Sequence, residues 1–143
     1  MRVVEFNARF GDPETQPLLE VLETPLGGVL LAAATGRLAD HGPLRWKPGA
    51  AVAVVMAASG YPEAPRSGDV IHGIADAEAL DGVRVLHAGT KLVDGELVTS
   101  GGRVLAVTAS AGSLAEARAQ AYAGVAKVTF DGAHARTDIA RRG

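Results

Sequence analysis

The spacing of apolar residues changes near the middle of the chain, and this change most constrains the fold. Residues 13–35 carry apolar side chains at helical spacing, whereas from Ala50 onward they form short runs typical of strands. Pro, Gly and single charged residues mark a boundary at residues 39–48. We therefore expect an α+β protein in which a strand and two helices precede a small, mainly antiparallel β unit with one amphipathic helix.

The first part of the chain is expected to begin with a strand at residues 3–7, followed by two helices. Asp12 is a good N-cap residue and Pro13 a good first helical residue, so we expect the first helix to start there. The second helix is expected from about residue 25 to residue 35, because Gly36 offers a C-cap.

The second part of the chain holds several strand signals and one helix signal. Asp94-Gly95 is the strongest hairpin signal, and Ser113 with Glu116 forms a capping box that opens a helix. The basic tail at residues 136–142 is expected to be solvated. The expected strands are residues 50–58, 70–74, 83–87, 91–93, 96–98 and 104–107.

The amino-acid composition mainly excludes certain kinds of site and partner. The chain has 143 residues, which suits one domain, and its formal net charge of −2 gives no pull toward nucleic acid. It has no cysteine, which excludes disulfides, zinc–thiolate sites and thiol nucleophiles. No apolar run is long enough to span a membrane. We expect a cytoplasmic protein that binds neither nucleic acid nor membrane.

Three polar residues share one face of the expected first strand: Glu5, Asn7 and Arg9. A carboxylate beside an amide oxygen suits a hard cation such as Mg²⁺, which would be shared with a polyphosphate. The alternative is an exposed face with a Glu–Arg surface pair of small energy. Two ligands alone leave both interpretations open.

Residues 5–16, EFNARFGDPETQ, closely resemble the segment that ends the ATP-grasp domain of the phosphoribosylamine–glycine ligases, also called glycinamide ribonucleotide synthetases. The similarity continues in order through short motifs at residues 60–62, 68–71, 87–90, 101–105, 117–122 and 136–139. The resemblance implies that residues 1–43 end an ATP-grasp domain and that residues 44–143 form the C-terminal domain. Ala140 stands where the resemblance leads us to expect glycine.

The resemblance also implies a reaction of de novo purine biosynthesis. In that family, ATP phosphorylates the glycine carboxylate, and the amine of 5-phosphoribosylamine then attacks the acyl phosphate. The products are glycinamide ribonucleotide, ADP and phosphate. Glu5 and Asn7 would hold Mg²⁺ or Mn²⁺ between the phosphates of the nucleotide.

Two neighbouring residues are candidates for catalytic roles under this resemblance. Arg9 shares the face of Glu5 and Asn7, so it could contact a phosphate or the oxygens of the acyl phosphate. Asp12 could accept a hydrogen bond from the substrate amine, but it could equally serve only as a helix N-cap.

A second group of candidates is expected to hold phosphoribosylamine: Thr90, Lys91, Gly101, Gly102 and Arg103. Two glycines before a strand expose backbone N–H groups, and an adjacent arginine suits a phosphate monoester. The alternative is a tight turn with a solvent-exposed arginine. Only the resemblance favours the substrate site.

In the resembled family, two lobes that hold ATP precede the strand of Glu5 and Asn7, and this sequence has no counterpart of their glycine-rich loop and lysine. We therefore expect a part of such a ligase, with the remaining lobes supplied in cis or in trans. Alone, these residues are expected to be inactive, because part of a nucleotide site cannot pre-organise phosphoryl transfer. The alternative is a non-catalytic binding or interaction module that keeps the C-terminal fold.

Overall fold

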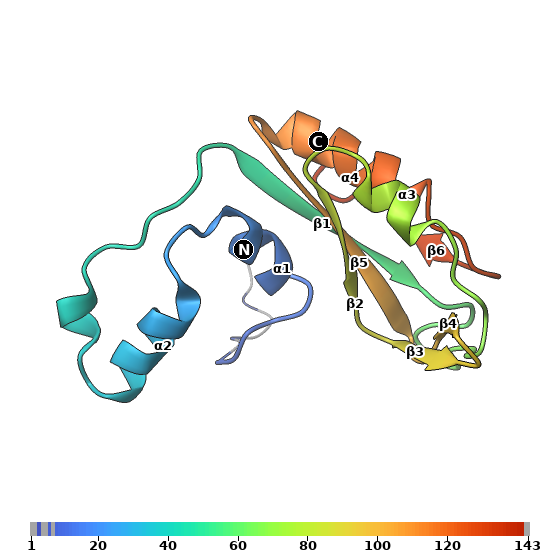
Figure 1. The fold of residues 1–143 in the computed structure, drawn as a ribbon, viewed down its shortest axis with the longest axis horizontal. Helices are drawn as coiled ribbons and strands as arrows, with labels where there is room; N and C mark the ends of the chain where they lie inside the picture. Colours follow the sequence, from blue (N-terminus) through green and yellow to red (C-terminus); the bar gives the residue numbers. More distant parts are fainter. Residues whose placement is uncertain (1–2, 4–5, 7, 142–143) are drawn as a thin grey trace.

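The computed structural model describes residues 3, 6 and 8–141, and its ribbon is drawn in Figure 1. The expected α+β class with antiparallel sheets is confirmed. The strand expected at residues 3–7 includes residues 4, 5 and 7, which lie outside the described residues. The elements are α1 (Thr15–Val21), α2 (Leu26–Ala34), the 3₁₀ helix η1 (Leu38–His41), β1 (Ala50–Ala57), α3 (Ile74–Glu78), β2 (Val83–His87), β3 (Thr90–Val93), β4 (Glu96–Thr99), β5 (Arg103–Ala111), α4 (Leu114–Val125) and β6 (His134–Ala135).

The main sheet has four antiparallel strands in the order β2-β5-β1-β6, and β3 and β4 form a separate hairpin. β1 and β5 pair along nearly their whole length, from Ala50 opposite Ala111 to Met56 opposite Leu105. A register shift after Met56 then places Ala57 opposite Arg103. This irregularity lies at the end of β1 where the candidate residue Arg103 begins β5.

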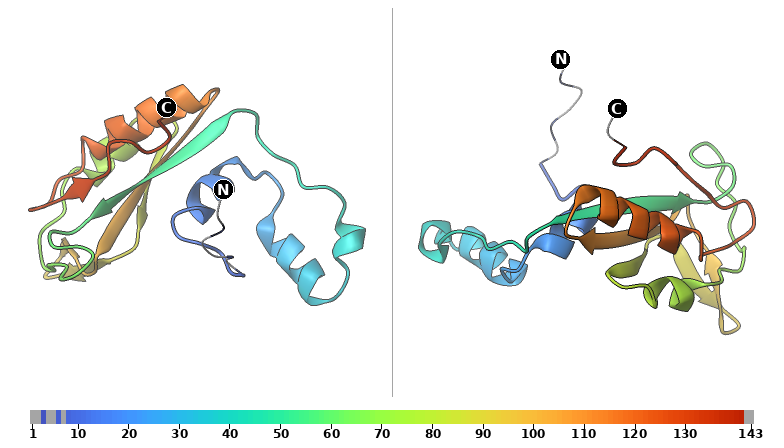
Figure 2. Two further views of the ribbon diagram at one scale, coloured as in Figure 1. Left: turned by 180° about the vertical axis from the view of Figure 1, so that it is seen from behind. Right: turned by 90° about the horizontal axis from the view of Figure 1, so that it is seen from above.

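Helices cover the sheet on both faces (Figure 2). The row formed by Val54, Val107 and Val85 across the strands faces α4 and belongs to the hydrophobic core. The adjacent row, Ala53, Thr108 and Arg84, faces α1. Because side chains alternate along each strand, the two rows separate the core from the face that carries α1.

Glu20 attaches α1 to the sheet. Thr108 donates its hydroxyl hydrogen to Glu20 Oε1 at 3.2 Å, and Arg84 Nε lies 3.4 Å from Oε2. The Glu20 side chain is only 11% exposed, so its carboxylate needs these partners to offset the loss of hydration. The first helix is thereby held over the centre of the sheet.

Several local signals in the sequence are confirmed. Asp94 and Gly95 have positive φ angles of 51° and 85°, as the tight turn between β3 and β4 requires. Ser113 accepts a hydrogen bond from the backbone N–H of Glu116 and thus caps α4. Gly36, with φ of 69°, follows the end of α2.

Two expectations about the elements are wrong, and one element was not expected. The first helix begins at Thr15, and its N-cap is Glu14 without a side-chain hydrogen bond, so Asp12 does not cap it. Residues 70–74 form only isolated bridges, because the left-handed Gly73 ends the extended run and Ile74 opens α3. The short strand β6 was not expected; its two residues carry no alternating pattern.

The C-terminal tail exposes Arg136 and Arg141 to solvent, as expected, but its backbone is attached to α4. Arg118 donates from Nε to the carbonyl of Ile139 at 2.9 Å and from Nη2 to that of Thr137 at 2.8 Å. The Tyr122 hydroxyl donates to the carbonyl of Arg136 at 2.7 Å and accepts from the Ile139 N–H at 3.1 Å. These bonds fix residues 136–139 beside the sheet.

None of the helices in the described part of the chain has the length and apolarity that a membrane span needs.

The contact between α4 and the sheet predicts the effect of Gly124→Ala. A Cβ at Gly124 would lie 2.8 Å from Val107 Cγ1 and 2.9 Å from Val83 Cγ1, two stiff and buried side chains. Overpacking costs about 1–3 kcal/mol and outweighs the helix-propensity gain of about 1 kcal/mol. Urea denaturation should show a net loss of up to about 2 kcal/mol. Gly27→Ala in α2, where a Cβ meets open space, should cause no loss; equal losses would contradict this account.

Ala140 has a φ of 54°, in the left-handed region that favours glycine. Ala140→Gly should therefore raise the free energy of unfolding by up to about 1 kcal/mol, since relief of strain outweighs the added chain entropy. The shift in the urea midpoint measures this effect. Ala133→Gly, at a residue without positive φ, should lower the midpoint; a loss in both variants would show that Ala140 is not strained.

Candidate functional site

Two of the expected site residues, Asp12 and Arg103, meet although they lie 91 positions apart. Arg103 donates from Nη1 to the backbone carbonyl of Asp12 at 2.9 Å, and its Nε lies 3.4 Å from Asp12 Oδ2. The other carboxylate oxygen of Asp12 accepts a hydrogen bond from Gln16 Nε2 at 2.6 Å. The turn before α1 is thus joined to the start of β5.

The two glycines before Arg103 allow close packing of neighbouring segments. A Cβ at Gly102 would lie 2.3 Å from Cδ2 of the Tyr61 ring, so the ring rests on the glycine backbone. A Cβ at Gly89 would lie 2.9 Å from the Cα of Gly101. These contacts explain the glycines as packing positions that place Arg103 beside Tyr61.

Thr90 and Lys91 belong to β3 and do not line the pocket that contains Arg103. The Thr90 hydroxyl lies 3.1 Å from Nδ1 of His87, and Lys91 is exposed. Of the five expected substrate-binding residues, only Arg103 lines this pocket.

Arg103 lines a pocket of about 270 Å³ on the face of β1 that presents Ala53, Val55 and Ala57. Small apolar side chains of β1 form one wall, and polar side chains from three other segments surround it. The lining residues are Pro13, Ala53, Val55, Ala57, Tyr61, Arg103, His134, Ala135, Arg136 and Ile139. The pocket is thus apolar on the sheet side and carries two arginines and a histidine on the other sides.

Sequence reasoning missed three polar residues of this pocket: Tyr61, His134 and Arg136. Tyr61 and Arg136 fall in short motifs that carry the family resemblance, which was the one signal available for them. No sequence pattern marked His134 as a pocket residue, because it reaches the pocket only through the pairing of β6 with β1.

Both arginines of the pocket have carboxylate partners. Arg136 donates to both oxygens of Asp138, at 2.9 and 2.6 Å, and this bidentate pair lowers the pKa of Asp138 from its usual value. Arg103 forms a longer ion pair with Asp12, with 3.4 Å between Nε and Oδ2. A guanidinium has more N–H donors than these contacts use, so the pocket retains the capacity to bind an anion.

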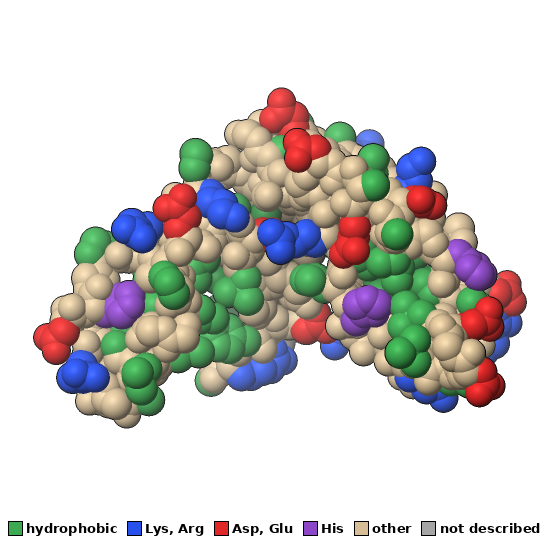
Figure 3. Space-filling model, in the orientation of Figure 1, with side chains coloured by type: hydrophobic (Ala, Val, Ile, Leu, Met, Phe, Trp, Pro, Cys, Tyr) green, Lys and Arg blue, Asp and Glu red, His purple; other side chains and the backbone are tan. Residues whose placement is uncertain are grey.

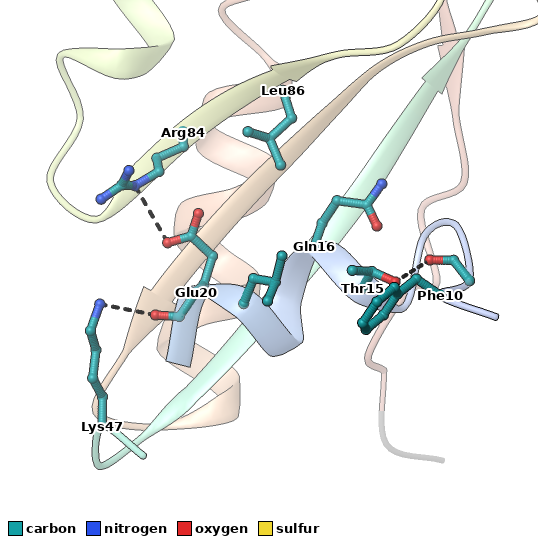
Figure 4. A pocket seen from close by; sticks show the side chains of 9 residues that line it. Phe10, Thr15, Gln16, Glu20, Lys47, Arg84 and Leu86 are labelled. Carbon is teal, nitrogen blue, oxygen red and sulfur yellow. Dashed lines mark hydrogen bonds and ion pairs between the residues drawn. The ribbon is translucent and has the colours of Figure 1, made fainter. Parts of the chain in front are cut away.

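A second pocket, of about 530 Å³, lies between α1 and β2 (Figure 4). Its two cations both point to Glu20: Arg84 pairs with the carboxylate, and Lys47 donates to the backbone carbonyl at 3.0 Å. These contacts attach α1 and the following segment to the sheet. We assign this pocket to the packing of α1.

The expected metal ligands Glu5 and Asn7 lie outside the described residues. Within residues 3, 6 and 8–141, no group of three His, Asp or Glu side chains could hold a metal ion. Arg9 is exposed, and its Nη1 donates to the carbonyl of Phe10 at 3.3 Å.

Known proteins match both the sequence and the fold of this chain. The family described as "Phosphoribosylglycinamide synthetase, C domain" matches residues 51–142. The phosphoribosylamine–glycine ligase of Streptomyces coelicolor is 55% identical over 144 residues, which cover 99% of this chain and 35% of the relative. The ligase of Synechocystis sp. is 52% identical over 142 residues, covering 99% of this chain and 34% of that protein.

A solved structure agrees with these matches. The crystal structure of phosphoribosylamine–glycine ligase from Thermotoga maritima has a TM-score of 0.80 and 35% identity, covering 95% of this chain and 32% of that one. The chain spans about a third of the length of the curated relatives that it matches. The resemblance found in the sequence is confirmed: the chain belongs to the phosphoribosylglycinamide synthetase family and contains its C domain.

Proposed function

We propose that the chain forms the C-terminal part of an ATP-dependent ligase that joins glycine to 5-phosphoribosylamine in de novo purine biosynthesis. The main support for this proposal is the sequence identity of 52–55% to proteins named phosphoribosylamine–glycine ligase. In the proposed division, residues 1–43 end an ATP-grasp domain and residues 44–143 form the C domain. A cytoplasmic location, as expected for a biosynthetic ligase, is part of the proposal.

The proposed reaction has two steps. The glycine carboxylate attacks the γ-phosphoryl group of ATP, which gives glycyl phosphate and ADP. The amine of 5-phosphoribosylamine then attacks the acyl carbon, and phosphate leaves as glycinamide ribonucleotide forms. Both steps require anionic groups to be held in fixed positions, which is a task for arginine side chains.

The Arg103 pocket is proposed to hold the phosphoribosyl part of the substrate or product. A guanidinium can bind a phosphate monoester through two parallel hydrogen bonds, and Arg136 adds a second positive charge. The small side chains of Ala53 and Val55 leave room for the ribose against the sheet. Thr90 and Lys91 are retained as candidates for contacts from the β3–β4 hairpin.

Glu5, Asn7 and Arg9 are proposed to serve the nucleotide side of the reaction. The carboxylate and amide oxygens of Glu5 and Asn7 are ligands that suit Mg²⁺ or Mn²⁺. Bound there, the metal would neutralise the negative charge of the phosphates. Arg9 would contact a phosphate oxygen.

The exposed apolar surface of α2 supports the proposal of an additional polypeptide partner. All of α2 is described, and it has no buried residue although its side chains are entirely apolar. Figure 3 shows hydrophobic side chains gathered in this region, where Leu30, Leu31 and Leu38 are exposed. Large exposed apolar patches mark interaction sites. We propose that the remaining ATP-grasp lobes cover this surface, in cis or in trans.

The same surface favours a second candidate function. A binding module without catalysis would also present an unpartnered apolar helix, with the C domain retained as its scaffold. The two functions differ in one respect: the complex formed when a partner covers α2 turns over substrate only if the chain is part of a ligase.

The 143 residues alone are expected to release no ADP in an assay that contains ATP, Mg²⁺, glycine and 5-phosphoribosylamine. The physical reason is that phosphoryl transfer needs a complete, pre-organised nucleotide site. Turnover by the purified chain would contradict this prediction.

Addition of the part of the Streptomyces coelicolor ligase that this chain does not match, which we propose contains the ATP-binding lobes, should produce glycine-dependent ADP release. Leu31→Asp should reduce this release at least tenfold, since it places a charge on the 61% exposed leucine of α2. Leu92→Asp is the matched control, because Leu92 is 72% exposed but lies on β3. Assembly without turnover would favour the binding module over the ligase.

The pocket predicts that glycinamide ribonucleotide binds the chain and that Arg103→Ala weakens this binding about tenfold or more. A charge-assisted hydrogen bond to phosphate contributes about 1.5–3 kcal/mol. Calorimetric titration measures the change. Arg37→Ala removes an exposed arginine beside α2 and should leave the affinity unchanged. Equal affinity of the wild type and Arg103→Ala would contradict the proposed pocket.

A further inference from the structure

Asp12 is paired with Arg103, whose guanidinium lines the proposed substrate pocket. Its carboxylate and backbone carbonyl both contact Arg103, and its neighbour Pro13 lines the same pocket. We infer that Asp12 is an internal competitor for the anion that Arg103 binds, so that a phosphate entering the pocket displaces the Asp12 carboxylate. This inference rests on the proposed role of Arg103.

The ion pair between Arg103 and the Asp12 carboxylate is weak enough to be displaced, whereas the 2.9 Å bond from Nη1 to the Asp12 carbonyl does not involve the carboxylate. The 3.4 Å separation of Arg103 Nε and Asp12 Oδ2 exceeds the usual length of a charge-assisted hydrogen bond. The two side chains are 43% and 44% exposed, so solvent screens their attraction. A phosphate monoester carries more charge than a carboxylate and offers three oxygens to the same donors.

The second arginine of the pocket provides an internal comparison. Arg136 and Asp138 are two positions apart and form a bidentate pair at 2.9 and 2.6 Å. Because Arg136 and Asp138 are held close together by their neighbouring backbone positions, an anionic ligand would gain little binding energy by separating them. Arg103 is therefore the arginine whose partner can change.

The turn that carries Asp12 can leave Arg103 without losing its own structure. Thr15 donates its backbone N–H and its hydroxyl to the carbonyl of Gly11, and Gln16 donates to Asp12 Oδ1. These bonds lie within the turn and the first residues of α1. Among the hydrogen bonds of the described residues, the one from Arg103 joins residues 8–14 to the sheet. Arg103 is thus the link between this turn and the sheet, and displacement of the Asp12 carboxylate by an anion would weaken that link.

The inference assigns Asp12 a role different from that of a ligand for the substrate amine. An amine ligand would strengthen binding of an amine-bearing molecule and would have no effect on inorganic phosphate. An internal competitor weakens the binding of the amine-bearing molecule and of inorganic phosphate alike. For glycinamide ribonucleotide the two roles therefore predict opposite effects of removing the Asp12 charge, and for inorganic phosphate only the competitor role predicts a change.

Calorimetric titration of the 143-residue chain with glycinamide ribonucleotide, and separately with inorganic phosphate, tests the inference. Asp12→Asn should bind both ligands about two- to fivefold more tightly, the range expected when an exposed ion pair no longer competes. Asp12→Ser should give the same gain, so the result does not depend on one variant. Glu14→Gln removes the same charge from the same exposed turn and should leave both affinities unchanged.

The double variant Asp12→Asn/Arg103→Ala should bind no more tightly than Arg103→Ala alone, because the gain acts through Arg103. Unchanged or weaker binding by Asp12→Asn, with binding still lost in Arg103→Ala, overturns this inference and leaves the proposed pocket in place. An equal gain in Glu14→Gln also overturns it, since net charge would then explain the effect. If Arg103→Ala binds like the wild type, the proposed pocket itself fails.

Discussion

The antiparallel pairing of β1 with β5 determines where β2, β6, α1 and α4 lie. Its residues alternate between a face covered by α4 and a face covered by α1, so both sides of the pair are largely removed from water. Burial on the α1 side includes Thr108, whose hydroxyl needs a partner and finds it in Glu20. The register shift at the end of this pair sets Arg103 beside the pocket.

The pocket forms where four parts of the chain meet: the turn before α1, the end of β1 with the loop that follows it, the start of β5, and the tail after β6. Two arginines bring positive charge to a site whose sheet side is apolar, and each arginine has a carboxylate partner. Arg118 and Tyr122 of α4 hold the backbone that carries Arg136 and Ile139. The amphipathic helix thus supports the site from the opposite face of the sheet.

The sequence predicted those elements whose signals are local. Asp94-Gly95 requires left-handed backbone at both turn positions, and Ser113 needs only Glu116 three residues later, so both were recognised. The meeting of Asp12 with Arg103 depends on the tertiary packing of α1 against β5 and has no local signal. For the same reason β6 and the attachment of the tail were missed. The family resemblance, carried by many short motifs, predicted the family correctly where composition did not point to it.

¹⁵N-resolved NMR of the labelled chain tests most directly whether the C domain holds the phosphoribosyl group in the pocket of Arg103, as proposed. Titration with glycinamide ribonucleotide should shift the backbone amides of Ala57, Tyr61, Arg103 and residues 134–139. The amides of Asp94 and Gly95, at the tip of the hairpin, should stay unchanged. Shifts confined to the hairpin or to α2, or no saturable shift at the pocket, would contradict the account.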